Sequence, residues 1–157
     1  MPVSSKVRTC LWFDSEGEAA AQLYVSLIPG SSIDSVFRPE PGKPPSMVNF
    51  TLAGVPYQIL NGGPGHPQTT AASISVQTDD QAETDKIWDA LVANGGSPVQ
   101  CGWLKDRFGL SWQIVPRRLP ELLGDPDRAK SARAMQAMMK MVKIDIAALE
   151  AAARAEV

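Results

Sequence analysis

Few side chains in this sequence suit proton transfer or nucleophilic attack. His66 is the only histidine, and an imidazole with an ordinary pKa of about 6.5 suits acid–base catalysis. Loops on a scaffold often carry sites, although a histidine among glycines and prolines is commonly just exposed. Cys101 is a candidate nucleophile beside Gly102 and Trp103, but a cysteine without a nearby base usually serves as apolar filler. The catalytic residues therefore stay unknown, with His66 and Cys101 as the candidates.

Two glutamines stand at matching places in two matching phrases. Gln58 lies in the phrase 57–60 (YQIL), and Gln113 lies in the phrase 112–115 (WQIV). Each phrase ends a segment whose pattern predicts a helix and several strands, so the chain resembles one module written twice, with a cleft between related halves. Equivalent amides on two sides of a pseudo-twofold axis could hold one polar ligand. The alternative is that each amide bonds to neighbouring groups or faces solvent.

Aromatic side chains accompany the two glutamines. Trp12, Trp103 and Trp112 fall on predicted strands, as do Tyr57 and Phe50. These rings could wall an apolar pocket for a planar organic ligand, or they could belong to the core, as most aromatic residues in strands do. The candidate ligand-binding residues are Gln58, Gln113, Trp12, Trp103, Trp112 and Tyr57.

Composition and charge limit the classes of function. The 157 residues are 44% hydrophobic, enough for a domain that buries roughly 70% of its unfolded surface. The net charge is −2, and no basic run alternates with aromatics, so we expect no nucleic-acid partner. No signal peptide or membrane-spanning apolar stretch is evident, which predicts a cytoplasmic protein without a membrane partner. Cys10 and Cys101 are too few for a disulfide framework, so we expect both to be thiols.

The first half predicts one helix among four strands. Strands are expected over residues 6–13, 32–38, 47–53 and 55–60. Asp14 or Ser15 could cap the helix, because Glu18 would complete a capping box, and the helical period continues to about Ile28. The prolines of residues 39–45 require a loop, and residues 54–56 predict a tight hairpin.

The second half repeats this order after the turn-rich segment 61–67, which we interpret as the crossover. Strands are expected over residues 73–78, 99–101, 103–106 and 110–115. The pattern predicts a helix over residues 81–94, with Asp79 or Asp80 as its cap and Glu83 near the third position. The charged turn 105–107 before Gly109 is expected to be solvated.

Beyond Pro116 the pattern becomes helical. The pair 125–126 (DP) predicts a capped helix start, and helix is expected to near Ala153. The apolar residues that recur at helical spacing are Met135, Met138, Met139 and Val142. This stripe must be covered by the domain, by a second copy of the chain, or by both, which favours a homodimer. A non-catalytic assembly role for the tail is a further alternative.

Three phrases resemble a known family. They are residues 10–14 (CLWFD), 60–64 (LNGGP) and 100–116 (QCGWLKDRFGLSWQIVP). They closely resemble the PhnB-like branch of the vicinal oxygen chelate superfamily, a branch also labelled 3-demethylubiquinone-9 3-methyltransferase-like. The superfamily includes glyoxalases, bleomycin-resistance proteins and extradiol dioxygenases. The likeness continues through residues 119–123 and 148–150, so it spans nearly the whole chain.

This resemblance implies an α+β fold built from two paired βαβββ modules, whose curved mixed sheets enclose a cavity. The domain would occupy residues 1–118, with modules at about 5–62 and 70–116. Residues 119–157 would form a helical extension that packs on the domain or on a dimer partner. The resemblance therefore implies a homodimeric protein with a small-molecule ligand in the cavity.

The resemblance also implies where a metal ion would bind. Metal-using members place histidine and glutamate side chains on the first and last strands of each module. The matching positions here are Gln58, Gln113, a residue near Ala71 and one of residues 7–9, and none is a histidine or a carboxylate. Because a neutral amide binds a transition ion weakly, the usual metal centre is expected to be absent, and no cofactor is expected.

Two readings of function stay open. In the first, the chain binds a small organic ligand without a metal, and no specific activity is assigned. In the second, it is a metal-assisted lyase, isomerase or dioxygenase whose divalent ion is held by unusual ligands such as His66, Gln58 and Gln113. Methyl transfer is not expected, because residues 62–64 (GGP) are not followed by a helix as in nucleotide-binding loops. Whether the chain is an enzyme is therefore left open.

Overall fold

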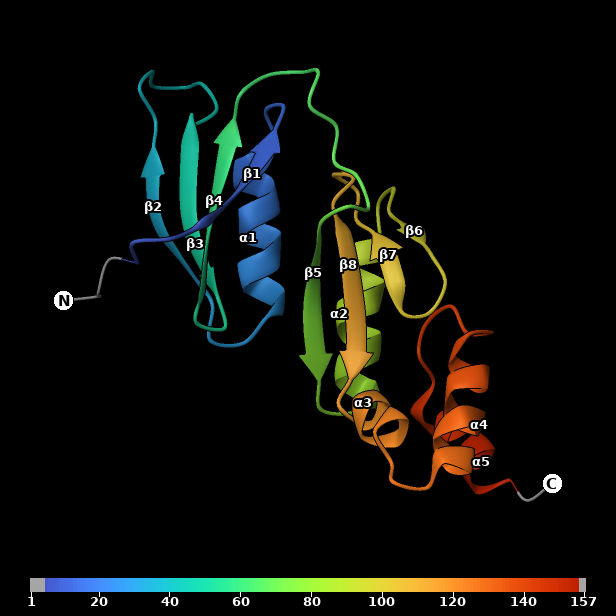
Figure 1. The fold of residues 1–157 in the computed structure, drawn as a ribbon. Helices are drawn as coiled ribbons and strands as arrows, with labels where there is room; N and C mark the ends of the chain where they lie inside the picture. Colours follow the sequence, from blue (N-terminus) through green and yellow to red (C-terminus); the bar gives the residue numbers. More distant parts are fainter. Residues whose placement is uncertain (1–4, 156–157) are drawn as a thin grey trace. The chain divides into compact units, whose positions relative to one another are not determined.

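The structure is a computed structural model that describes residues 5–155. Contacts within the chain divide it into two compact units, one ending at Gln68 and the other beginning at Thr69 (Figure 1). Each unit contains one four-stranded mixed sheet and a helix between its first two strands. The predicted pair of βαβββ modules is therefore confirmed.

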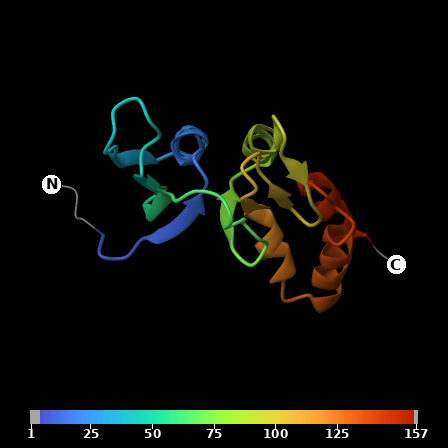
Figure 2. The same ribbon diagram turned by 90° about the horizontal axis from the view of Figure 1, so that it is seen from above.

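The first unit has its strands in the order β1-β4-β3-β2. Its elements are β1 (Thr9–Phe13), α1 (Gly17–Leu27), β2 (Ser32–Phe37), β3 (Met47–Leu52) and β4 (Val55–Asn61). β1 runs parallel to β4, and the other pairs are antiparallel. Val48 and Phe50 of β3 and Ile59 of β4 have no exposed surface and lie on the side of the sheet that α1 covers. In Figure 2, α1 lies along one side of this sheet.

The start of α1 differs from the prediction. The residue before the helix is Glu16, whose side chain makes no capping hydrogen bond, so the capping box at Asp14 or Ser15 was wrong. Instead, Asn61 on β4 accepts a hydrogen bond from the N–H of Gly17 at 2.9 Å. Gly17 has no room for a side chain, because a Cβ would lie 2.1 Å from Ile59. The close approach of helix and strand therefore supplies a cap from a distant part of the sequence.

The second unit repeats this connectivity in the strand order β5-β8-β7-β6. Its elements are β5 (Ser73–Thr78), α2 (Gln81–Val92), β6 (Ser97–Pro98), β7 (Trp103–Lys105) and β8 (Ser111–Pro116). Here the predicted cap is confirmed: Asp80 accepts from the N–H of Glu83 at 2.8 Å, and Glu83 accepts from the N–H of Asp79 at 3.1 Å. α2 contacts β5, β7 and β8.

The strand expected at residues 99–101 was wrong. β6 ends at Pro98, and the N–H of Trp103 donates to the carbonyl oxygen of Gln100 at 3.2 Å. The two residues between them, Cys101 and Gly102, have φ angles of 60° and 84°. Two consecutive left-handed residues form the type of turn that closes tight hairpins, so this segment connects β6 to β7.

The charged turn 105–107 was also expected to be solvated, and for Asp106 that was wrong. Asp106 is only 2% exposed. Its carboxylate accepts hydrogen bonds from the N–H groups of Phe108 and Leu110, at 2.9 and 3.0 Å, and from the indole Nε1 of Trp112 at 2.9 Å. Asp106 thus anchors the turn that leads into β8. Sequence pattern alone does not distinguish such an anchor from an exposed turn residue.

The C-terminal extension forms three short helices, in agreement with the helical pattern expected to near Ala153. They are α3 (Arg118–Leu123), α4 (Arg128–Met138) and α5 (Ile146–Arg154). The cap of α4 is Asp127 instead of the predicted 125–126 pair, because its side chain accepts from the N–H groups of Ala129 and Lys130. The helices share a buried cluster of Leu119, Leu122, Ala134, Ile144, Leu149 and Ala153.

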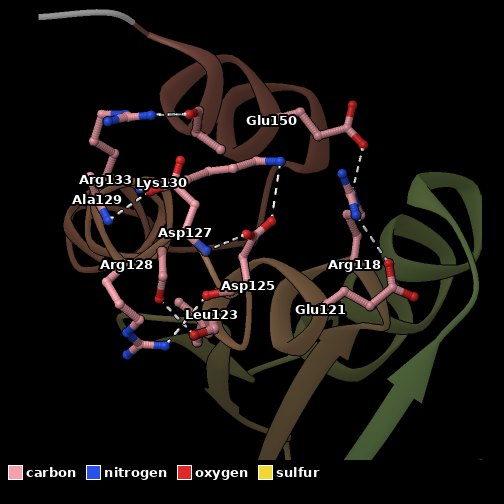
Figure 3. A network of polar contacts seen from close by, with 12 residues as sticks. Arg118, Glu121, Leu123, Asp125, Asp127, Arg128, Ala129, Lys130, Arg133 and Glu150 are labelled. Atoms are coloured by element: carbon pink, nitrogen blue, oxygen red, sulfur yellow. Dashed lines mark hydrogen bonds and ion pairs between the residues drawn. The ribbon is translucent and has the colours of Figure 1, made fainter.

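Polar contacts tie these helices together (Figure 3). Arg118 on α3 pairs with Glu121 at 3.2 Å and with Glu150 on α5 at 3.1 Å. Arg133 on α4 donates to the carbonyl oxygen of Ala153 at 2.7 Å, where a helix end leaves carbonyl groups without intrahelical partners. The extension is therefore a packed three-helix body.

The extension belongs to the second unit and packs on the βαβββ module of that unit. The amide of Gln81, at the start of α2, donates to the carbonyl oxygen of Ile144 and accepts from the N–H of Ile146. The N–H groups of Cys101 and Gly102 donate to the carbonyl oxygens of Met141 and Val142, both at 2.8 Å.

In the described part of the chain, no helix combines the length and apolar character needed to cross a membrane.

Candidate functional site

The first sheet carries two contrasting rows on its open face, which we define as the face opposite α1. Paired residues on neighbouring strands share a face, and successive residues along a strand alternate between faces. The first row has a polar centre, with Gln58 of β4 between Cys10 of β1 and Asn49 of β3, and Ser35 of β2 beyond. The second row is apolar and consists of Trp12, Leu60, Met47 and Phe37.

Gln58 is half-buried, and its amide nitrogen donates to Oδ1 of Asn49 at 3.0 Å. The neighbouring apolar row is accessible, since Phe37 is 64% exposed and the other three side chains are half-buried. An exposed large apolar side chain beside half-buried amides suits an organic molecule with both an apolar body and polar groups.

The structure brings His66 to Trp12. The two rings lie 4.2 Å apart between centroids, tilted by 44°. The indole Nε1 of Trp12 donates to the carbonyl oxygen of Gly63 at 2.9 Å, and Gln68 donates to the carbonyl oxygen of Trp12 at 2.5 Å. Gly62 must be a glycine, because a Cβ there would lie 2.3 Å from the indole ring. The loop after β4 is therefore held on Trp12, and His66 lies at one end of the apolar row.

The second sheet places Gln113 at the position equivalent to Gln58. On the open face, defined as the face opposite α2, Gln113 of β8 lies between Ser75 of β5 and Trp103 of β7. Gln113 and Trp103 are half-buried. The amide nitrogen of Gln113 donates to the Ser73 hydroxyl at 3.0 Å. Both glutamines thus donate within their own sheets.

Tyr57 and Trp112 lie on the other faces of their sheets, because each immediately precedes a glutamine on the same strand. The ring of Tyr57 stacks on Phe50, with centroids 5.5 Å apart, and burial raises the pKa of its hydroxyl above 10.0. Trp112 has no exposed surface and bonds to Asp106. A ligand-binding role for either ring stays a prediction that their present surroundings do not support.

Charged groups flank the amide row of the first sheet. Arg8 contacts Asp34 at 3.3 Å, and the hydroxyls of Thr51 and Ser32 donate to the same carboxylate at 2.7 and 2.9 Å. Burial alone would raise the pKa of Asp34, but the hydrogen bonds from Thr51, Ser32 and Arg8, together with the charge of Arg8, hold it below 3.8. This carboxylate is therefore ionised and paired at neutral pH.

Both cysteines are free thiols, and they lie on different parts of the fold. Cys10 is an exposed thiol on the open face of the first sheet beside Gln58, a placement that sequence reasoning missed because it depends on strand register. Cys101 is half-buried in the β6–β7 turn. Among residues 5–155, no group of three or more His, Cys, Asp or Glu side chains is placed to hold a metal ion.

The chain is similar to several known proteins. Residues 5–115 match the model of a family described as 3-demethylubiquinone-9 3-methyltransferase. A PhnB protein from Bacillus cereus is 29% identical with a TM-score of 0.62, covering 71% of this chain and 99% of its own.

Two further solved structures share the fold. A protein from Pseudomonas aeruginosa is 22% identical with a TM-score of 0.59, covering 72% of this chain and 98% of its own. A fosfomycin resistance protein from Listeria monocytogenes is 17% identical with a TM-score of 0.55, covering 78% of this chain and 99% of its own. No curated protein matches the chain.

Proposed function

We propose that this chain, which belongs to the 3-demethylubiquinone-9 3-methyltransferase family in the PhnB-like branch of the vicinal oxygen chelate superfamily, binds a small organic ligand. The open face of each sheet carries candidate binding groups, and no divalent metal would be required. The ligand would carry an apolar, largely planar body and polar groups that hydrogen-bond to neutral amides. No reaction is assigned.

The main support for this proposal is that a glutamine stands at the equivalent position of each unit, Gln58 in the first and Gln113 in the second. Both stand on the last strand of a module, on the open face, with the amide nitrogen bonded inside the sheet. Such a bond fixes the orientation of the amide, so its oxygen can accept a hydrogen bond from a ligand at little further cost in side-chain entropy. An amide brings no charge, which suits a polar organic group better than a metal ion.

The apolar row of the first sheet supports the same proposal. Phe37, Met47, Leu60 and Trp12 form a continuous strip across four strands. Burial of about 100 Å² of this strip under a planar ligand would contribute roughly 2.5 kcal/mol. The Trp12–His66 pair would border the ligand at one end of the strip.

Methyl transfer has less support. The glycines at positions 62 and 63 follow β4 but lead into an irregular segment up to β5 rather than a helix. A glycine-rich loop that binds a nucleotide cofactor normally opens a helix, whose N-terminus faces the phosphate or ribose. Gly62 has a different use here, because it gives the Trp12 ring its space.

The ligand proposal can be tested with planar amide probes. Salicylamide titrated into the ¹⁵N-labelled full-length chain should shift the side-chain amide of Gln58 and the indole resonance of Trp12. The Gln58→Ala variant should weaken this binding about fivefold to tenfold, the value of one hydrogen bond. Gln22→Ala, on the exposed side of α1, is the matched control. Equal binding by both variants would count against the proposal.

Native mass spectrometry of the purified protein provides a second test. A noncovalently bound small molecule that is retained by the wild type and lost from Gln58→Ala and Gln113→Ala would support the proposal. Elemental analysis of the same sample addresses the metal-assisted alternative. A stoichiometric divalent ion, lost on substitution of either glutamine, would overturn the metal-free form of the proposal.

A homodimer is also proposed, because the extension leaves part of its apolar stripe uncovered. Met138 packs on the buried cluster of the extension, whereas Met135 of α4 and Met139, which follows α4, are 45% and 58% exposed. The paired substitutions Met135→Lys and Met139→Lys should convert a dimer to a monomer in light scattering. Gln136→Lys, exposed on the same helix, should leave the mass unchanged. An unchanged mass in the methionine variant would exclude this surface as the interface.

A further inference from the structure

The open face of the second sheet has a row of hydroxyl groups beside one ammonium group. Register places the row across all four strands. It consists of Ser73 on β5, Ser111 on β8, Lys105 on β7 and Ser97 on β6. The strand residues of this face include no carboxylate, since the remaining ones are Ser75, Gln77, Trp103, Gln113 and Val115.

Ser111 is the unusual member of this row. Its side chain is 1% exposed, and among the residues that the structure describes it holds the one buried side-chain polar atom without a hydrogen-bond partner. A buried hydroxyl left in this state destabilises the folded protein. Its neighbours Lys105, which is exposed, and Ser73, which is half-buried, reach solvent. Ser111 therefore lies in the row between two residues that reach solvent.

The first sheet shows what such a row can bind, because the chain is an internal repeat. Register makes Ser32 and Thr51 of the first sheet equivalent to Ser97 and Lys105 of the second. In the first sheet both hydroxyls donate to the carboxylate of Asp34, which also pairs with the cation Arg8. There, hydroxyls and a cation surround a carboxylate that the chain itself supplies.

The second sheet has the same kinds of donor but lacks that carboxylate. Asp34 stands two residues after Ser32, and the residue two after Ser97 is Val99, which is apolar and 39% exposed. The row therefore brings hydroxyls and an ammonium group together, but none of its side chains can accept hydrogen bonds from them in the way that the carboxylate of Asp34 does.

We propose that the row formed by Ser73, Ser111, Lys105 and Ser97 on the second sheet binds the carboxylate group of a small organic molecule, at the position equivalent to that of Asp34 in the first sheet. Within the proposed function, on which this inference rests, the ligand is then a small organic acid. The three hydroxyls and the ammonium group of this row can stabilise a carboxylate through charge-assisted hydrogen bonds. Gln113 holds Ser73 by donating to its oxygen, which leaves the Ser73 hydroxyl proton for the ligand.

Benzoate and benzamide form a matched pair of probes, because they have nearly the same shape and differ in charge. In titrations of the ¹⁵N-labelled full-length chain, benzoate should shift the backbone amides of Ser111 and Lys105. Benzamide should bind there at least about tenfold more weakly, since it offers no charge to the ammonium group. Added salt should weaken the binding of benzoate but not that of benzamide.

Two substitutions test the site itself. Ser111→Ala should weaken benzoate binding about tenfold and at the same time raise the melting temperature of the free protein, because it removes an unpaired buried hydroxyl. Val99→Asp should supply an internal carboxylate, as Asp34 does, and so abolish benzoate binding; Val99→Asn is its neutral control. Ser15→Ala, exposed before α1, controls for loss of a serine.

The inference is overturned if benzoate causes no shifts at the row, or if Ser111→Ala and Val99→Asp bind it as tightly as the wild type. It is also overturned if the ligand retained in native mass spectrometry has no acidic group, a result that leaves the proposed function intact. Conversely, benzoate binding at the row with no effect of the Gln58 variants on salicylamide would refute the proposed function and leave this site standing.

Discussion

Replacement of Asp106 tests whether one buried carboxylate holds the turn before β8. In Asp106→Ala, the N–H groups of Phe108 and Leu110 and the indole Nε1 of Trp112 all lose their acceptor. Each hydrogen bond contributes roughly 1 kcal/mol, and a buried donor left unpaired adds about 1–3 kcal/mol. Because Trp112 has no exposed surface, water cannot replace its partner. We therefore expect the free energy of unfolding to fall by about 3–5 kcal/mol.

The assay is urea unfolding followed by circular dichroism, with Asp106→Asn as the graded control. The asparagine keeps an acceptor for the two backbone N–H groups but meets the Trp112 indole with a donor, so its cost should be about 1–3 kcal/mol. In the Trp112→Phe background, Asp106→Asn should then cost much less. A loss below about 0.5 kcal/mol for Asp106→Ala, typical of an exposed site, would refute the assignment of Asp106 as an anchor.

Three further predictions concern the first unit. Asp34→Asn should lower the free energy of unfolding above pH 3.8, and the difference from the wild type should vanish as the pH falls through the lowered pKa of the native carboxyl. Denaturant unfolding of both proteins between about pH 2 and pH 7 measures this difference, and a value that stays constant with pH would contradict the prediction. Gly62→Ala should displace the Trp12 ring and lower the free energy of unfolding by about 2 kcal/mol or more. Gly63 has open space but a φ of 89°, so Gly63→Ala should lower it by only about 1–2 kcal/mol. Tryptophan fluorescence should change in Gly62→Ala alone, and equal spectra of the two variants would argue against the packing of Gly62 on Trp12. Asn61→Ala should cost about 1 kcal/mol by removing the cap of α1, and unchanged thermal unfolding would show that the helix does not depend on it.

Local signals in the sequence predicted the order of the elements. The 3.6-residue period of the two helices, the prolines of residues 39–45 and the turn-rich segment 61–67 are all read within a few neighbouring residues. The similar phrases around Gln58 and Gln113 also predicted that the module is duplicated, because equivalent strands bury equivalent side chains. The cap of α2 was also predictable, since Asp80 and Glu83 lie within one helical turn.

Contacts between residues that are distant in the sequence were harder to predict. The cap of α1 comes from Asn61, 44 residues beyond Gly17, and a pattern search around the helix start finds Ser15 and Glu18 instead. The local pattern predicts that Asp106 is a solvated turn residue, because Lys105 and Arg107 flank it. Its burial depends on the indole of Trp112, which only the folded turn brings near.

The sequence by itself determined the duplicated module, the family likeness and the choice of two neutral amides at equivalent places, since each depends on residue type and spacing along the chain. Tertiary structure decided which side chains share a face. Strand register assembled the apolar row from Phe37 to Trp12 and the hydroxyl row through Ser111, and alternation moved Tyr57 and Trp112 away from the glutamines beside them. The physical reason is that a shift of one residue in strand pairing moves every side chain of that strand to the opposite face of the sheet. The pairing itself is fixed by contacts across the whole sheet.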